Sequence, residues 1–254
     1  MVPQVWQYGF PCGWRIAVLN SQLVIQRIVL TAELHTHSSL SHDGRDPVDF
    51  LLEQAKAIGL DVIAITDHDQ IEASLDAASM APEYGLVGLP GIEVSSADGH
   101  VIGLGVREVI PRGHDFATTV DMIHDAGGIA VVPHPFQSSR QGVLTKASKA
   151  TVIEHADAIE VYNSRLLTGR SNRKADRFAT AHGLPKTAGS DAHIGEMVGQ
   201  AITLIDTDEV SVEAIIEAIA AGRTAIEGKR TPWRISFKQA GGGVKRRVQR
   251  RLMR

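Results

Sequence analysis

The sequence predicts an α/β fold in which parallel strands close into a barrel. Short β-branched runs, each ending in a polar cluster, alternate with amphipathic helical stretches through the middle of the chain. Strands that alternate with helices pair in parallel, and seven or eight such units favour a closed barrel over an open sheet. The 254 residues are enough to bury a full core in one large domain or two small ones.

Eight segments have the β-branched, apolar character of buried strands. We expect their carboxyl ends to lie on one face of the barrel, where such folds carry their active sites. The segments are 28–34, 61–66, 86–92, 101–106, 128–133, 158–161, 185–188 and 201–205.

Five segments, four between these strands and one after the last of them, have the periodicity of amphipathic helices. Asp46-Pro47 is typical of an N-cap followed by proline at the first helical position. Gly59, Gly127 and Gly183 lie where three of the helices should end and the chain should turn back into a strand. The helical segments are 47–58, 71–81, 116–126, 170–182 and 212–221.

The composition narrows the class of protein. A hydrophobic content of 43%, a charged content of 22% and a net charge of -3 are typical of a globular protein. The single cysteine, Cys12, excludes an internal disulfide framework and a cysteine-rich zinc site, and it favours a reducing, cytoplasmic location. Aromatic residues make up only 5%, which weakens any function based on stacking of bases or sugars. No run of about 18 apolar residues occurs, so we expect no membrane span.

The two ends of the chain differ from the predicted barrel, which we place at residues 28–230. Residues 1–27 form an N-terminal extension without the features of a signal peptide. Two interpretations stay open for it: a disordered segment, or a start codon that lies further downstream. Residues 231–254 form a basic tail, and the chain carries no acidic residue from Lys229 onward. A solvated, frayed helix is the simpler interpretation of this tail. The alternative is a segment that binds nucleic acid or anionic lipid through its positive charge.

Histidines and carboxylates gather where the predicted strands end. Because these ends share one face of a parallel barrel, six histidines and three carboxylates should converge at one mouth. His35 and His37 are two residues apart on a strand, so both side chains should point to the same side. The nine residues are His35, His37, Asp43, His68, Glu93, His100, His134, Asp191 and His193.

This convergence predicts a metal centre. Imidazole and carboxylate are ligands of zinc, manganese and iron, and so many carboxylates would repel one another without a cation. Each residue alone has a simpler explanation: a His-x-His pair arises by chance, Asp191 can cap a helix, and His100 begins a strand instead of ending one. Taken together, these explanations require several independent coincidences at one end of the barrel.

The other five histidines are weaker candidates. Surface or capping roles suffice for His114, His124, His155 and His182, which lie within or near the ends of predicted helices. His42 is ambiguous because it neighbours Asp43 and competes with it as a ligand.

The motifs that contain the nine residues resemble those of the polymerase and histidinol phosphatase (PHP) family of metal-dependent phosphoesterases. The resemblance spans residues 31–229 and implies a distorted (βα)7 TIM-like barrel that binds two or three divalent ions of manganese, zinc or iron. The motifs are LHTHS from Leu34, SHDG from Ser41, ITDHD from Ile65, GIE from Gly91, HP from His134 and SDAH from Ser190.

The resemblance also implies how the ligands divide among the ions. The segment 40–44 is one residue longer than the shortest form of this segment in the family. Either His42 or Asp43 can therefore supply the ligand there, and the Asp-Gly pair favours Asp43. The implied sets are His35, His37, Glu93 and Asp191 for the first ion, Glu93, His100 and His134 for the second, and Asp43, His68 and His193 for the third.

Two more side chains are candidates for the implied reaction, in which a hydroxide held between metal ions attacks a phosphate ester. Arg165 follows another predicted strand and is a candidate to bind the phosphate, although a plain surface arginine is an equally good interpretation. Asp67 is a candidate to orient a ligand histidine from behind.

Three functions are consistent with these observations. The leading one is hydrolysis of a small phosphomonoester, such as a nucleotide, a nucleoside bisphosphate or histidinol phosphate. The second is an exonuclease on 5′ or 3′ ends of oligonucleotides, because the family includes polymerase-linked exonucleases and because the basic tail can contact nucleic acid. A non-catalytic metal-binding module is the third, and it is disfavoured because every ligand position is filled.

Overall fold

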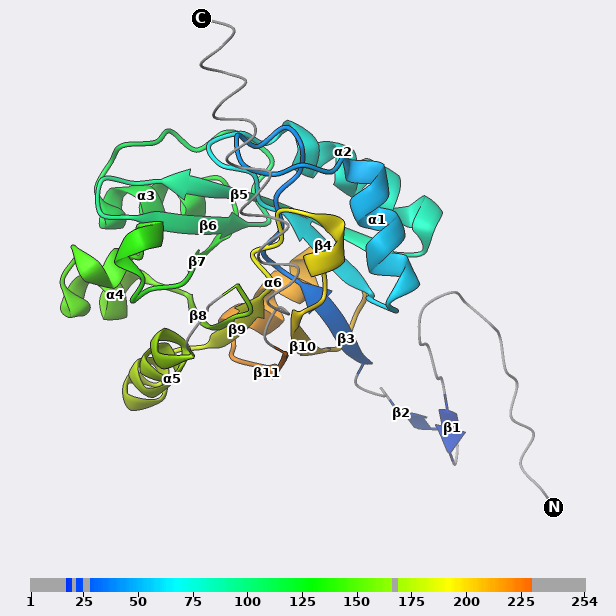
Figure 1. Cartoon of the computed structure of the whole chain (residues 1–254). Helices are drawn as coiled ribbons and strands as arrows, with labels where there is room; N and C mark the ends of the chain where they lie inside the picture. The colour runs from blue at the N-terminus through cyan, green and yellow to red at the C-terminus, as the bar shows by residue number, and fades with distance from the viewer. Residues whose placement is uncertain (1–16, 20–21, 25–27, 166–168, 230–254) are drawn as a thin grey trace, which may run out of the picture.

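The computed structural model describes residues 17–19, 22–24, 28–165 and 169–229. Their main feature is a nine-stranded sheet that rolls into a nearly closed barrel (Figure 1). Its strands are β3 (Ile28–Glu33), β4 (Val62–Ile65), β5 (Val87–Ser95), β6 (His100–Leu104), β7 (Ile129–Val132), β8 (Ala158–Asn163), β9 (Lys186–Gly189), β10 (Ala201–Thr207) and β11 (Thr224–Gly228). The α/β barrel predicted from the sequence is therefore confirmed.

Helices cover the outside of this sheet, with α1 and α2 on one side of the barrel and α3 and α4 on the other (Figure 1). The five predicted helices are present with ends shifted by at most one residue, whereas α4 and strand β11 are not predicted from the sequence. The helices are α1 (Val48–Ala57), α2 (Glu72–Met80), α3 (Phe116–Asp125), α4 (Lys149–His155), α5 (Arg170–His182) and α6 (Val212–Ala220).

The predicted helix ends are partly correct. Gly59, Gly127 and Gly183 all adopt positive φ angles, as expected of residues that terminate a helix in the left-handed region. The predicted cap of α1 is wrong, because Pro47 occupies the N-cap position. The carboxylate of Asp46 instead accepts a hydrogen bond from the backbone N–H of Gly195, at 2.7 Å.

The strand order is β11-β10-β3-β4-β5-β6-β7-β8-β9, and the pairing is not wholly parallel. Strand β6 is antiparallel to β5 and β7, and β10 is antiparallel to β3 and β11. The expectation of parallel pairing fails at β6 because only residues 96–99 connect it to β5, too few for a crossover helix. The link from β9 to β10, residues 190–200, likewise holds only a single 3-10 turn.

The reversed direction of β6 explains the position of His100. In a parallel strand, its first residue would lie at the barrel end opposite to the predicted site. Because β6 runs the other way, His100 pairs with Ser95 at the carboxyl end of β5. A residue that begins a strand is thereby placed beside residues that follow strands.

The barrel closes where the chain leaves β3 and β9. Thr36 and Ala192 form a parallel bridge, and the backbone N–H of His37 donates to the carbonyl of Ala192 at 2.7 Å. The buried carboxylate of Glu33 lies in the same seam, where it accepts hydrogen bonds from the hydroxyl and the backbone N–H of Ser190. Burial raises the pKa of Glu33 to about 7, although these hydrogen bonds oppose the shift. The closure thus joins two segments that both carry predicted ligands.

Helix α6 fills the barrel from the end opposite to this seam. Its Ile215, Ala218 and Ile219 are fully buried and pack with Leu30 and Leu89 of the strands in one apolar cluster. Two further clusters lie between the sheet and the outer helices. Burial of such side chains stabilises the fold by about 1.5–3 kcal/mol each.

Several predictions from the sequence concern the chain ends. The described residues there are the strands β1 (Ala17–Leu19) and β2 (Gln22–Val24), which pair with each other in the predicted N-terminal extension. The rest of that extension and the basic tail of residues 231–254 lie outside the described residues, so their interpretations stay predictions. Among the described helices, none is long and apolar enough to cross a membrane.

The fit of α6 can be tested by substituting Ile215, which is fully buried in the barrel. We expect Ile215→Ala to lower the free energy of unfolding by about 2–5 kcal/mol, because the surrounding strands cannot collapse onto the space left behind. Glu217 lies on the exposed face of the same helix, so Glu217→Ala should cost under about 0.5 kcal/mol. Denaturant unfolding measures both, and equal losses would contradict this role of α6.

Candidate metal centre

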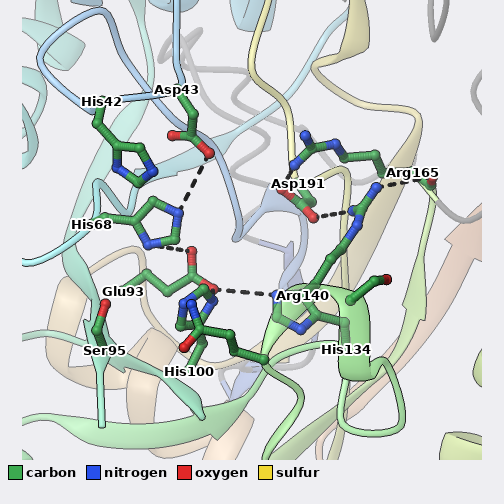
Figure 2. A pocket seen from close by; sticks show the side chains of 12 residues that line it. His42, Asp43, His68, Glu93, Ser95, His100, His134, Arg140, Arg165 and Asp191 are labelled. Carbon is green, nitrogen blue, oxygen red and sulfur yellow. Dashed lines mark hydrogen bonds and ion pairs between the residues drawn. The ribbon is translucent and has the colours of Figure 1, made fainter. Parts of the chain in front are cut away.

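The nine predicted residues come together at one end of the barrel, around the carboxylate of Glu93 on β5. Those that line the cavity are drawn in Figure 2, namely Asp43, His68, Glu93, His100, His134 and Asp191. Oε2 of Glu93 lies 3.4 Å from Nε2 of His35, 3.2 Å from Nε2 of His37 and 3.4 Å from Nδ1 of His68. Its Oε1 lies 2.9 Å from Nδ1 of His100 and 3.3 Å from Nε2 of His134. One fully buried carboxylate therefore faces five imidazole rings, which come from four different segments of the barrel because His35 and His37 share one.

Asp191 forms a second focus close to the first. Its Oδ1 lies 3.9 Å from Nε2 of His35, 3.7 Å from Nε2 of His37 and 3.3 Å from Nδ1 of His193. His35 and His37 thus both point toward the same two carboxylates, as their spacing of two residues predicts. Asp191 has a φ angle of 50° and His134 one of 32°, a region that non-glycine residues occupy at a cost of about 1–3 kcal/mol and mostly at functional sites.

The loop after β3 brings Asp43 to the other side of the cluster. Oδ2 of Asp43 lies 2.6 Å from Nε2 of His193 and 3.5 Å from Nε2 of His68. Gly44 passes so close to the backbone of Ser38 that any larger residue would clash, which explains the Asp-Gly pair. His42 is exposed, and its ring packs 4.9 Å from that of His68. The geometry favours Asp43 as the ligand, while His42 stays within reach of the same group.

The arrangement of ligand atoms suits divalent cations. Five groups of three residues hold nitrogen or oxygen atoms within 4.8 Å of one another. They are His35, His37 and Asp191; His35, Glu93 and His134; His37, His68 and Glu93; His37, Asp43 and His193; and His42, Asp43 and His68. Each predicted ligand except His100 belongs to at least one group, and His100 lies against Glu93.

Unsatisfied buried atoms give a separate test of the fit to metal. A buried polar atom without a hydrogen bond costs about 1–3 kcal/mol, so a cluster of them requires a physical explanation. Within the described residues, seven such atoms belong to predicted ligands. Because each ring offers one nitrogen to an ion, metal coordination would satisfy most of the seven. They are Nε2 of His35, Nδ1 and Nε2 of His37, Nδ1 of His68, Oε1 of Glu93, Nδ1 of His100 and Nδ1 of His134.

Two arginines lie at the edge of this cluster, one predicted and one not. Nη1 of Arg165 lies 3.0 Å from Oδ1 of Asp191, and Nη1 of Arg140 lies 2.6 Å from Oδ2 of the same carboxylate. Their side chains are 23% and 24% exposed and line a cavity of about 340 Å³ together with Glu93 and His134. Arg140 was missed because no motif in the sequence marks it; only the path of the loop after β7 brings it to Asp191.

Comparison with known proteins agrees with this geometry. Residues 169–224 match the PHP-associated family. A two-domain protein of Bacteroides vulgatus that contains a predicted PHP-like metal-dependent phosphoesterase has the same fold, with a TM-score of 0.68 at 21% identity over 80% of this chain and 66% of that one. An uncharacterised protein of Methanocaldococcus jannaschii is 30% identical over 187 residues, which are 72% of this chain and 73% of the relative. The chain belongs to the PHP family.

Two sequence relatives with named reactions match a smaller part of this PHP protein, and a nuclease shares its fold over a larger part. A phosphoribosyl 1,2-cyclic phosphate 1,2-diphosphodiesterase of Eggerthella lenta is 38% identical over 85 residues, 31% of this chain and 32% of that enzyme. A 3′,5′-nucleoside bisphosphate phosphatase of Chromobacterium violaceum is 34% identical over 83 residues, 31% of this chain and 29% of the relative. The lesion-specific endonuclease Q of Pyrococcus furiosus shares the fold, with a TM-score of 0.60 at 18% identity over 78% of this chain and 58% of that one. The family resemblance noted in the sequence is confirmed, and with it the class of phosphoric ester hydrolases.

The charges of the PHP centre are strongly coupled. Burial alone would raise the pKa of Glu93, but the neighbouring histidines, led by His68 and His100, hold it well below its usual value. Burial would likewise raise the pKa of Asp191, and the two arginines lower it instead. The carboxylates therefore stay ionised at neutral pH, as metal ligands must.

The histidines respond to these carboxylates in different ways. Burial would lower the pKa of His68, yet Glu93 and Asp43 raise it to about 9. Burial opposes the shift of His35 as well, and the charge of Glu160 holds the pKa of that ring well above its usual value. His193 behaves in the opposite way, because burial and the charges of His37 and Arg165 lower its pKa to about 4. Without a cation, His35 and His68 therefore carry protons at neutral pH that a metal ion would displace.

The interpretation of Asp67 from the sequence is wrong. Its carboxylate accepts hydrogen bonds from the backbone N–H of Ser38 at 2.6 Å and from the Ser38 hydroxyl at 2.5 Å, and not from a histidine among the described residues. Asp67 therefore holds the loop that follows His37. A carboxylate outside the nine predicted ligands that does bond to a ligand ring is Glu160, which lies 2.9 Å from Nδ1 of His35.

The central position of Glu93 predicts the effect of removing its charge. We expect Glu93→Gln to weaken binding of manganese or zinc by at least about 100-fold, above the 10–100-fold typical of residues behind the ligands. Metal content after desalting, measured by plasma mass spectrometry, checks this. Asp121→Asn, on the exposed face of α3, is the control and should leave the metal content unchanged. Full metal content in Glu93→Gln would refute the central role of this carboxylate.

Metal binding should release protons and become tighter as the pH rises. The pKa of His68 is about 9 without metal, so at pH 7 its proton competes with the cation, and above pH 9 that competition ends. Affinity should rise about tenfold per pH unit for each proton displaced. Calorimetric titration in two buffers of different ionisation enthalpy counts the protons. Binding without proton release at pH 7 would contradict the protonated state of His35 and His68.

Proposed function

We propose that this protein is a phosphatase that hydrolyses a phosphomonoester of a small molecule, such as a nucleotide, a nucleoside bisphosphate or a similar compound. The observation that carries the proposal is the pair of arginines, Arg140 and Arg165, which reach the rim of the predicted metal centre inside one cavity. Guanidinium groups bind phosphate oxygens in a bidentate manner and stay charged at any physiological pH. The cations that the cluster would hold and the two adjacent arginines can together neutralise the charge of a terminal phosphate.

The side chains of the site fall into two groups, those that would hold metal ions and those that would bind the substrate phosphate. The nine predicted ligands would hold two or three ions of manganese, zinc or iron, since mixed nitrogen and oxygen ligands suit all three. When bound, such ions would supply an activated water and a clamp for the phosphoryl oxygens. Arg140 and Arg165 bond to Asp191 and line the cavity, where both guanidinium groups would bind the phosphate of a substrate. Their partial exposure leaves them room to do so.

The cavity supports a small, polar substrate. Its volume of about 340 Å³ is at the lower end of the usual range for ligand sites. Besides the charged residues, Ser95, Ser139 and Gln141 line it and offer hydrogen bonds to a hydroxylated leaving group. We also propose a cytoplasmic setting, because Cys12 is the single cysteine of the sequence.

A nuclease is the second candidate, and a specific feature favours it. The first half of α5, a few residues after Arg165, exposes Arg170, Arg173, Lys174 and Arg177. Cations in the first turn of a helix oppose its dipole, so this placement favours a ligand with negative charges. A nucleic-acid strand that enters the cavity could lie along this helix, and the basic tail could extend the contact.

Phosphate release from a panel of substrates separates these candidates. The panel contains sugar phosphates, histidinol phosphate, mononucleotides, nucleoside bisphosphates and short oligonucleotides, each incubated with manganese-loaded protein. Turnover of monoesters alone supports the phosphatase, and turnover of oligonucleotides alone moves the function to a nuclease. Absence of any turnover with metal bound would support a non-catalytic binding module.

The proposed role of the two arginines can be tested with a matched set of variants. We expect Arg165→Ala and Arg140→Ala each to lower kcat/KM for the best substrate by about 100-fold, comparable to the loss of one oxyanion donor. Arg112, largely exposed beside Asp69, provides the control, and Arg112→Ala should retain activity. Metal content should stay at the wild-type level in all three proteins. Wild-type kcat/KM in both Arg140→Ala and Arg165→Ala would exclude the arginine pair as the phosphate site.

A further inference from the structure

Strand β8 supplies none of the nine predicted ligands, yet one of its carboxylates contacts two of them. Glu160 is only 2% exposed. Its Oε1 lies 2.9 Å from Nδ1 of His35, and its Oε2 accepts a hydrogen bond from the backbone N–H of His134 at 2.8 Å. Glu160 thereby joins the segment after β3 to the segment after β7.

Asn163, at the end of the same strand, extends this contact to a third ligand. Its Nδ2 donates to Oε2 of Glu160 at 3.0 Å and to Oδ2 of Asp191 at 3.3 Å. The backbone of Asn163 is itself fixed by Asn172 of α5, whose side chain accepts from its N–H at 3.2 Å and donates to its carbonyl at 3.1 Å. The amide is therefore held between two carboxylates by a rigid support.

These contacts determine which nitrogen of His35 is available for a cation. A carboxylate accepts, so Nδ1 of His35 must carry the hydrogen that faces Glu160. The lone pair of a neutral ring then lies on Nε2, which points to Glu93 and Asp191 and has no hydrogen-bond partner. A carboxylate behind a histidine also makes the ring a stronger ligand.

The contact with His134 has a different effect. His134 has a φ angle of 32°, and its backbone N–H would be buried without a partner if Glu160 were absent. The hydrogen bond helps to hold this residue in a conformation that costs about 1–3 kcal/mol. The ring of His134 is thus kept at 3.3 Å from Glu93.

We propose that Glu160, supported by Asn163, is the positioning residue of the metal centre: it fixes the ring of His35 with Nε2 toward the cation and anchors His134 and Asp191 around the same site. The proposal rests on metal binding by this site and not on the identity of the substrate.

Asp157 provides a matched control three residues earlier in the chain. Its Oδ2 lies 2.7 Å from Nε2 of His124 and accepts the backbone N–H of Ala130 at 2.7 Å. Like Glu160, it joins a histidine ring to a backbone N–H from the β7 segment. Neither His124 nor Ala130 belongs to the metal centre. Asp157 therefore joins two segments of the fold, as Glu160 does, but positions no predicted metal ligand.

The test compares Glu160→Gln, Asn163→Ala and Asp157→Asn in the full chain. Glutamine keeps the size of Glu160 but offers one acceptor oxygen to three donors, so its amide NH₂ must face at least one of them. Each variant is titrated with zinc and with cobalt, and the visible spectrum of the cobalt form reports the geometry around the ion. Thermal unfolding of the metal-free proteins measures stability separately.

We expect Glu160→Gln to weaken zinc binding by about 10–100-fold and to alter the cobalt spectrum. Asn163→Ala should act in the same direction with a smaller loss. Asp157→Asn should lower the unfolding temperature and leave the affinity and the spectrum at wild-type values. Wild-type affinity and spectrum in Glu160→Gln, or an equal loss of affinity in Asp157→Asn, would overturn the proposal.

Two further outcomes are informative. If Glu160→Gln does not fold, Asn163→Ala decides, and wild-type zinc affinity in that variant would overturn the proposal. If the wild-type protein binds metal but releases no phosphate from any substrate, the proposed phosphatase function fails, whereas the role of Glu160 is still decided by the affinities.

Discussion

The gathering of five imidazole rings around the buried carboxylate of Glu93 is the constraint on which the site depends. Ionised and polar groups leave water only at a high cost in free energy, and here several of them do so without hydrogen-bond partners. Opposite charges inside the cluster offset part of that cost, since the carboxylates keep their charge and two histidines gain protons. Cations with nitrogen and oxygen ligands would satisfy most of these atoms, in agreement with membership of the PHP family.

The barrel tolerates such a centre because its two ends differ. The end that α6 fills is apolar and tightly packed, and it supplies the burial that stabilises the fold. The opposite end carries the polar cluster, the strained backbone of His134 and Asp191, and a closure made by hydrogen bonds between the segments after β3 and β9. Stability and chemistry are therefore located in separate layers of one barrel, as in other barrels with active sites at the strand ends.

Around the predicted ligands lies a second set of residues that controls them. Glu160 and Asn163 contact the ligands from the barrel side, and Arg140 and Arg165 contact them from the cavity side. The first pair is buried and holds its partners in place. The second pair is partly exposed and lines the cavity. Asp191 is bonded to both pairs, so its carboxylate connects the support of the site to its opening.

The sequence by itself determined the barrel, five of its six helices and the nine candidate ligands, because strand and helix periodicity and the residue types that bind metals are local properties. Tertiary structure alone decided the reversed direction of β6, which brings His100 to Glu93, and the helix α4 and strand β11, which have weak local signals. It also decided the contacts of Glu160, Arg140 and Asp67. The physical reason is distance along the chain: Glu160 is 125 residues from His35, and Arg140 is 51 residues from Asp191. Such contacts follow from how the closed sheet stacks its strands, and no local pattern of residues encodes them.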